Sequence, residues 1–220
     1  MVRDDQQEVT KNPISLLFVE GGTDEIFYKR IKSDLLADCR CTVENLQGLY
    51  NINVKVIDRV VDYLRQHKDE KIRVYCCLDR ESRYGTPPGF DLKRIKKYIR
   101  DENIEGVLGV NVKKATQQIE SWFFYDIEGI YRFLKVPRTQ RNPAAFKPTE
   151  RFGYKDLQRL FERYNKTYTK GKSAKNFINH LNIEKIVSNC KELNEGIAVI
   201  QSQATDLTNH LFPTKTYKGA

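Results

Sequence analysis

The first half of the amino-acid sequence alternates short apolar runs with amphipathic segments. The apolar runs are 14–19, 41–46, 72–78 and 107–112. Short apolar runs bounded by polar or turn residues are typical of buried strands in a parallel sheet. The segments between the runs carry apolar residues at helical spacing and are 23–36, 51–67 and 91–100. This alternation predicts an α/β fold with a parallel sheet of about four strands flanked by helices.

The second half of the chain has a different pattern. Residues 116–134 predict one helix rich in aromatic residues, among them Trp122, Phe123 and Phe124, which we expect in the core. Residues 136–149 contain three prolines and predict a loop. Further helices are expected at 152–164, 172–181 and 183–204. The sequence therefore predicts a core at residues 1–115 and a helical C-terminal portion, 116–220, packed on it.

Composition indicates a globular protein of the cytoplasm. Hydrophobic residues make up 40% of the chain and charged residues 30%. The apolar runs are far shorter than the ~20 residues that cross a bilayer, and the polar N-terminus does not resemble a signal peptide. The five cysteines lack zinc-finger spacing, so we expect them to be reduced and structural. We expect no membrane association.

Carboxylates follow two of the predicted strands. Glu20 ends the first apolar run before two glycines, and Asp79 and Glu81 end the third. Parallel strands of an open sheet bring their C-terminal ends to a common crevice, so these side chains are expected to converge. Oxygen ligands without sulfur or imidazole favour Mg²⁺ or Mn²⁺. Acids after strands also cap helices, and we expect this simpler role for Asp24 and its neighbours, with Thr23 as the cap.

The motifs V-E-G-G-T-D-E and L-D-R-E resemble the TOPRIM domain shared by topoisomerases, primases and a set of nucleases. Glu20 matches the glutamate of that family and Asp79 its first aspartate, while Glu81 stands in place of the second aspartate. The later segment I-E-S-W-F-F-Y-D is similar to small stand-alone bacterial TOPRIM proteins related to the overcoming-lysogenization-defect nucleases. Glu120 and Asp126 match that segment. The resemblance implies that Glu120 helps to hold a second metal ion, and that the protein acts in anti-phage defence beside an ABC-type ATPase.

Basic residues suggest a polyanionic partner. The net charge is +9 and the isoelectric point is near 9.2, which favours nucleic acid. The basic clusters are Arg94, Lys96, Lys97 and Arg100; Lys113 and Lys114; and Lys166, Lys170, Lys172 and Lys175. We assign Lys113, at the end of the fourth predicted strand, to stabilising transition-state charge. Lys114 and the third cluster are assigned to nucleic-acid binding, although such lysines are also commonly only solvated.

The sequence thus predicts a metal-dependent nuclease that hydrolyses phosphodiester bonds in DNA or RNA. Glu20, Asp79, Glu81 and Lys113 are its expected catalytic residues, and Glu20, Asp79, Glu81 and Glu120 its expected metal ligands. Glu20 could act instead as a general acid or base. The alternative is a TOPRIM-like nucleic-acid-binding module without catalysis that serves as a partner subunit. The choice of DNA or RNA, and the formation of homo-oligomers, stay open.

Overall fold

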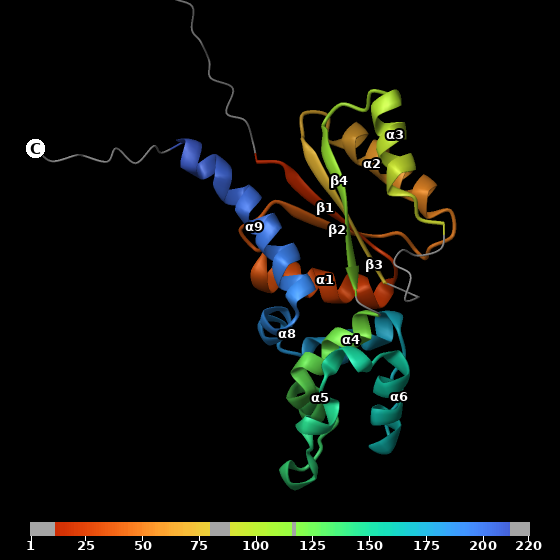
Figure 1. Ribbon diagram of the computed structural model, residues 1–220, viewed down its shortest axis with the longest axis vertical. Coiled ribbons are helices and arrows are strands. Elements are labelled where there is room, and N and C mark those ends of the chain that lie inside the picture. Colours follow the sequence, from red (N-terminus) through yellow and green to blue (C-terminus); the bar gives the residue numbers. More distant parts are fainter. Residues whose placement is uncertain (1–11, 80–88, 116–117, 212–220) are drawn as a thin grey trace, which may run out of the picture.

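The fold is built on a sheet of four parallel strands. The computed structural model describes residues 12–79, 89–115 and 118–211. The strands are β1 (Ile14–Val19), β2 (Cys41–Asn45), β3 (Ile72–Asp79) and β4 (Val107–Ala115), in the spatial order β2-β1-β3-β4 (Figure 1). The predicted α/β class and the parallel four-stranded sheet are confirmed.

Helices cover both faces of this sheet. Between the strands come α1 (Gly22–Leu35), α2 (Ile52–Gln66) and α3 (Leu92–Asp101). Leu17 and Tyr75 point into an apolar cluster with α1 and the C-terminal helices, whereas Leu16 and Val74 point into a second cluster with α2 and α3. Because neighbouring residues of a strand face opposite sides, continuous apolar runs are needed to fill both clusters.

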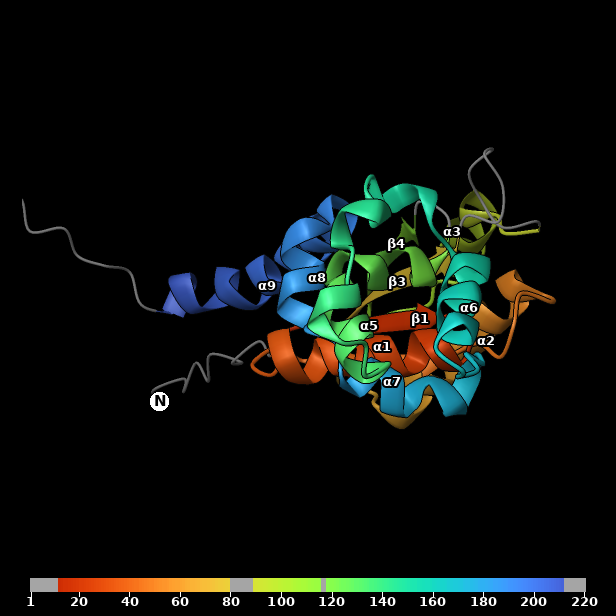
Figure 2. The ribbon, with the colours of Figure 1, turned by 90° about the horizontal axis from the view of Figure 1, so that it is seen from below.

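The helical C-terminal portion lies over one end and one face of the sheet. Its α-helices are α4 (Ile119–Phe123), α5 (Ile127–Phe133), α6 (Tyr154–Arg163), α7 (Lys175–Asn179), α8 (Ile183–Asn189) and α9 (Lys191–Leu211). The 3-10 helices η1 (Phe124–Asp126), η2 (Arg138–Gln140), η3 (Pro143–Phe146), η4 (Thr149–Arg151) and η5 (Gly171–Ala174) connect them. Seen from below, α5, α6, α7 and α8 lie in front of the sheet (Figure 2). Trp122, Phe123 and Phe124 are buried, as expected.

The prediction of a single helix at 116–134 was wrong, because the helical conformation is interrupted at Asp126. That residue is 1% exposed, and its carboxylate accepts hydrogen bonds from the Asn182 N–H at 2.9 Å and from Lys185 Nζ at 3.1 Å. These bonds hold Asp126 at φ −112° and ψ 53°, outside the helical region. A Cβ at Gly129 would lie 1.9 Å from Asp126 Oδ2, so this glycine makes room for the buried carboxylate.

Two other predicted helices are also divided. The segment 183–204 breaks at the buried Cys190, whose backbone is extended (φ −101°, ψ 103°), and forms α8 and α9. The segment 172–181 forms η5 and α7. Both breaks let the separate helices turn their apolar sides toward one core, with Phe177, Ile186 and Leu193 all buried there. No helix in the described ranges has the length and apolar character needed to cross a membrane, and all five cysteines are free thiols.

Candidate functional site

The candidate site lies where the direction of the strand order reverses. β1 pairs with β2 on one side and with β3 on the other, so the crevice between β1 and β3 is the topological switch point, the usual ligand position in open α/β sheets. Glu20 directly follows β1, and Asp79 is the last residue of β3. In Figure 1 the arrowheads of β3 and β4 run toward α1 and α4.

Two further carboxylates join this crevice. Asp24 comes from the first turn of α1, and Glu120 comes from α4 and is fully buried, with 0% exposure. Side chains of a helix lean toward its N-terminus, which directs Asp24 back toward Glu20. We call Glu20, Asp24, Asp79 and Glu120 the acid cluster. Its members come from four separate elements or element ends of the chain.

Burial and mutual repulsion perturb the acid cluster. Burial, followed by repulsion from Glu20 and Glu120, raises the pKa of Asp24 to about 7. Burial, followed by repulsion from Asp24, Glu120 and Glu20, raises the pKa of Asp79 to about 8. Both effects disfavour the charged form of a carboxyl group. Asp24 and Asp79 therefore keep their protons to a higher pH than ordinary aspartates do.

Lys170 supplies positive charge beside the acid cluster. Its Nζ lies 3.3 Å from Glu120 Oε1, and the same ammonium lies over the Tyr154 ring at 5.0 Å from the centroid. Burial opposes the charge of Lys170, but attraction to Glu120 and Asp79 raises its pKa above the usual value. The Tyr168 hydroxyl donates a hydrogen bond of 3.1 Å to Glu120 Oε1. One oxygen of Glu120 thus has two partners from the C-terminal portion.

The other oxygen of Glu120 provides a test of whether a metal ion fits. Glu120 Oε2 is buried and has no hydrogen-bond partner, an arrangement that is costly for a charged group unless an ion satisfies it. The donors of the acid cluster are all carboxylate oxygens, which suits Mg²⁺ or Mn²⁺. Asp79 Oδ1 already accepts the Ile119 N–H at 3.0 Å, which orients that carboxylate. The chemistry of the donors therefore fits a hard divalent cation.

The present side-chain positions do not form a finished coordination sphere. In the described part of the chain, no three His, Cys, Asp or Glu side chains are arranged so that they could hold a metal ion. Glu81, a predicted ligand, lies outside the described residues, as do the side chains of Lys113 and Lys114. Binding of a cation by the acid cluster therefore requires side-chain rotation, with displacement of the Lys170 ammonium as the obvious step.

A close backbone contact holds the Lys170 segment against α1. Thr23, expected to cap α1, instead accepts a 2.7 Å hydrogen bond from the Gly171 N–H, and Gly21 occupies the cap position. A Cβ at Gly22 would lie 3.1 Å from Gly171 Cα, so the second glycine after Glu20 permits this approach. Gly171 has φ +82°, a conformation that favours glycine. These contacts fix Lys170 beside the acids.

The lysines predicted to bind nucleic acid fall into two groups. Lys166 Nζ donates a 2.7 Å hydrogen bond to the Phe133 carbonyl and lies over the Phe133 ring, while Lys170 faces the acid cluster. Lys172 and Lys175 instead line an open groove of about 550 Å³ beside Gly22. Of these four lysines, Lys172 and Lys175 are therefore the two that line a groove next to the start of α1.

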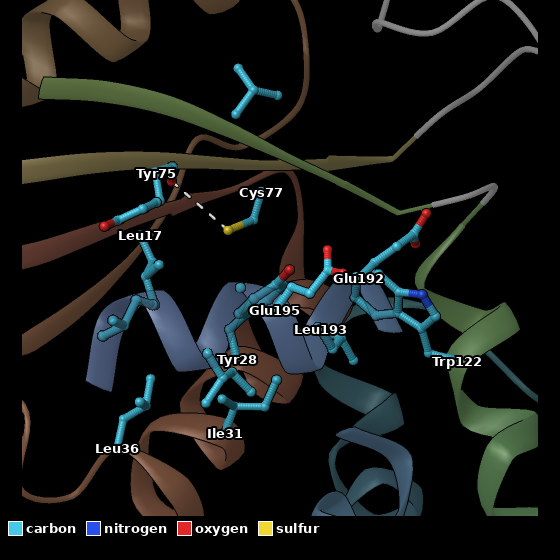
Figure 3. Close-up of a pocket in the computed structure, with 14 residues that line it drawn as sticks. Leu17, Tyr28, Ile31, Leu36, Tyr75, Cys77, Trp122, Glu192, Leu193 and Glu195 are labelled. Carbon is cyan, nitrogen blue, oxygen red and sulfur yellow. Dashed lines mark hydrogen bonds between the residues drawn. The ribbon is translucent and has the colours of Figure 1, made fainter. Parts of the chain in front are cut away.

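An apolar cavity of about 250 Å³ lies beside the acid cluster, between the sheet, α1 and α9 (Figure 3). Tyr28, Cys77 and Trp122 are among its lining residues. Burial, followed by the neighbouring Cys77 thiol, raises the pKa of Tyr28 well above its usual value. None of the four members of the acid cluster lines this cavity. We therefore assign the chemistry to the acid cluster and not to the cavity.

Sequence reasoning missed three contributors to the site. Asp24 was expected only to stabilise the start of a helix, Lys170 was expected on a nucleic-acid surface, and Tyr168 was not selected. The four-residue spacing between Glu20 and Asp24 was an available signal for Asp24. Asp126, which matched the same motif as Glu120, does not join the acid cluster; it binds Lys185 and the Asn182 N–H.

Comparison with known proteins identifies the family. The fold and the carboxylates at its switch point define an α/β protein with a candidate acidic ligand site. The model of the family described as "Domain of unknown function (DUF4276)" matches residues 19–199, and the chain belongs to this family. That match spans the acid cluster and Lys170. No curated protein and no solved structure matches the chain.

Proposed function

We propose that the protein is a metal-dependent nuclease that hydrolyses phosphodiester bonds in DNA or RNA. The observation that carries the proposal is the acid cluster: four carboxylates at the switch point, with the pKa values of Asp24 and Asp79 raised to about 7 and 8. Such perturbed groups in a crevice favour a functional site over a structural one. The resemblance of the Glu20 and Asp79 motifs to TOPRIM nucleases supports the same function.

Glu20, Asp79 and Glu120 would hold the divalent cation, with Glu81 as a further candidate ligand. When bound, Mg²⁺ or Mn²⁺ would supply neutralisation of the scissile phosphate and activation of water. Asp24, with a pKa near 7, is suited to accept or return a proton near neutral pH. Glu20 is the alternative proton acceptor.

Lys170 is suited to a role that the sequence assigned to Lys113. Its raised pKa keeps the ammonium protonated at neutral pH. After release from Glu120, that ammonium would lie beside the acid cluster and would donate to a phosphate oxygen, where it would stabilise developing negative charge. Lys113 remains a second candidate, since its backbone pairs with Cys77 two residues before Asp79.

The test is cleavage by the purified full chain with Mg²⁺ or Mn²⁺, using plasmid, single-stranded DNA and total tRNA as substrates. Glu120→Gln keeps the side-chain volume and an oxygen that accepts from Tyr168, so it removes charge without opening a cavity. Glu102→Gln, on an exposed residue after α3, is the matched control. Loss of metal-dependent cleavage in Glu120→Gln alone supports the proposal, and full activity of that variant refutes the role of Glu120.

The second candidate function is nucleic-acid binding without catalysis. The observation that favours it is the ion pair between Lys170 and Glu120, which compensates part of the charge without any metal. We also propose, from the resemblance, that the protein acts beside an ABC-type ATPase in anti-phage defence. Cleavage should therefore be assayed with and without a co-encoded ATPase. Binding without cleavage in both settings would favour the second candidate.

A further inference from the structure

A basic pocket lies at the end of β4 that is remote from the acid cluster. The pocket has a volume of about 470 Å³ and opens beside residues 107–111 of β4 and the C-terminal part of α3. Its charged lining residues are Arg73, Lys96 and Arg100, and no Asp or Glu side chain lines it. Lys96 and Arg100 belong to a basic cluster that the proposed function does not otherwise use.

The pocket exists because the edge strand is irregular there. Ile72 pairs with Val107 and Arg73 pairs with Gly109, so Leu108 is an extra residue that bulges from the pairing and is 49% exposed. Gly109 adds no side chain opposite Arg73. β4 is also an edge of the described sheet, so its outer side has no neighbouring strand there. Bulges at sheet edges redirect side chains and are frequent next to binding sites.

Arg73 provides an independent sign of a ligand. Its Nε is buried and has no hydrogen-bond partner, and a buried donor without an acceptor is unfavourable. Arg73 shares a sheet face with Tyr75, whereas Lys96 and Arg100 come from α3, which packs on the other face. The three cations therefore approach the edge strand from its two sides. A guanidinium group binds phosphate oxygens through two parallel hydrogen bonds.

We propose that this pocket binds a phosphate group, and that the phosphate belongs to a nucleic-acid backbone that runs along β4 toward the acid cluster. β4 connects the two sites, because its last residue, Ala115, pairs with Asp79. Gly109 and Ala115 are six residues apart, which at ~3.3 Å per residue corresponds to about 20 Å. That distance is about six steps of duplex DNA at ~3.4 Å each.

The phosphate chemistry rests on the pocket, whereas the choice of nucleic acid as its source rests on the proposed function. The experiment therefore measures binding by the full chain in EDTA, where metal-dependent cleavage does not occur. Lys96→Gln/Arg100→Gln removes two cations of the pocket. Lys93→Gln/Arg94→Gln removes two exposed cations of the same helix that do not line the pocket. The net charge of the two variants is equal.

Binding of a fluorescent duplex of about 20 base pairs is titrated at several salt concentrations, because each phosphate contact adds about 0.9 to the slope of log K against log[salt]. We expect the pocket variant to lose affinity and about 1–2 units of slope, and the control to retain both. Equal losses in the two variants would assign the effect to general positive charge and overturn the proposal. Unchanged binding in the pocket variant would also overturn it.

A second arm separates the two sources of phosphate. Inorganic phosphate and pyrophosphate are tested for thermal stabilisation of the wild type and both variants. One outcome would overturn the nucleic-acid assignment in favour of a small phosphate compound. In that outcome, phosphate or pyrophosphate stabilises the wild type and the control but not the pocket variant, and the wild type does not bind nucleic acid. Duplex binding that depends on the pocket while no substrate is cleaved with metal would support this inference and refute only the nuclease proposal.

Discussion

Replacement of Asp79 by asparagine is expected to stabilise the metal-free protein. Asp79 is 8% exposed and close to three other acids, and the pKa of its carboxyl group is about 8 in the folded protein compared with 3.8 for the free group. The asparagine oxygen can still accept the Ile119 N–H that Asp79 Oδ1 accepts at 3.0 Å. The substitution therefore removes charge and repulsion while the local hydrogen bond is preserved.

The size of the expected stabilisation follows from the pKa of Asp79. Because the folded state holds its proton to higher pH than the unfolded state, the free energy of unfolding decreases as pH rises from about 4 to about 8. At ~1.4 kcal/mol per pH unit, the free energy of unfolding falls by at most a value on the order of 5 kcal/mol over this range. The same repulsion also acts on Asp24, so only part of this loss belongs to Asp79 alone. We therefore expect Asp79→Asn to raise the free energy of unfolding by about 2 kcal/mol at pH near 8 and by little near pH 4.

The assay is urea unfolding in EDTA at several pH values between about 4 and 8, with the midpoint and slope fitted separately. Asp58→Asn, on an exposed position of α2, is the matched control and should leave the pH dependence unchanged. Added Mg²⁺ should stabilise the wild type more than Asp79→Asn, because an ion that binds only the folded state adds RT ln(1 + [L]/Kd). An Asp79→Asn variant with the wild-type pH dependence would refute the reasoning.

Three other variants test separate features. Lys170→Met should lower the free energy of unfolding by about 1–2 kcal/mol, a modest value because the Lys170 side chain is 45% exposed. The same variant should bind Mg²⁺ more tightly in calorimetry, since no ammonium competes for the acids. Gly129→Ala should destabilise by about 3 kcal/mol or more in thermal unfolding, because its Cβ would lie 1.9 Å from Asp126 Oδ2. Lys172→Gln/Lys175→Gln should flatten the salt dependence of duplex binding by about 0.9 per lost contact, and an unchanged slope would assign these lysines to solubility.

The strand ends were predictable because parallel strands leave a strong signal. Apolar runs mark both faces of a covered sheet, and strand direction then places Glu20 and Asp79 on one edge. The helix breaks were not predictable from periodicity alone. The D-x-x-G spacing of Asp126 and Gly129 becomes informative only when it is known that Asp126 is buried and that Lys185 is its partner.

The composition of the acid cluster was less predictable than its location. Asp24 has the same sequence pattern as an acid that merely stabilises a helix start. Lys170 lies 50 residues after Glu120, and no periodicity joins them. Their contact depends on how the C-terminal helices pack, and on the close approach of Gly171 to Gly22. Such long-range contacts are set by tertiary structure and leave no local signal in the sequence.

The order of the site residues along the chain has a consequence for synthesis. All four acids of the cluster are translated before Lys170, and the interval of about 50 residues takes several seconds at ~5–20 residues per second. During that interval Glu120 lacks both Tyr168 and Lys170, the partners of its Oε1 in the folded protein. Under the proposed function, the four acids of the cluster are therefore present in the growing chain several seconds before the ammonium group that is proposed to bind the phosphate.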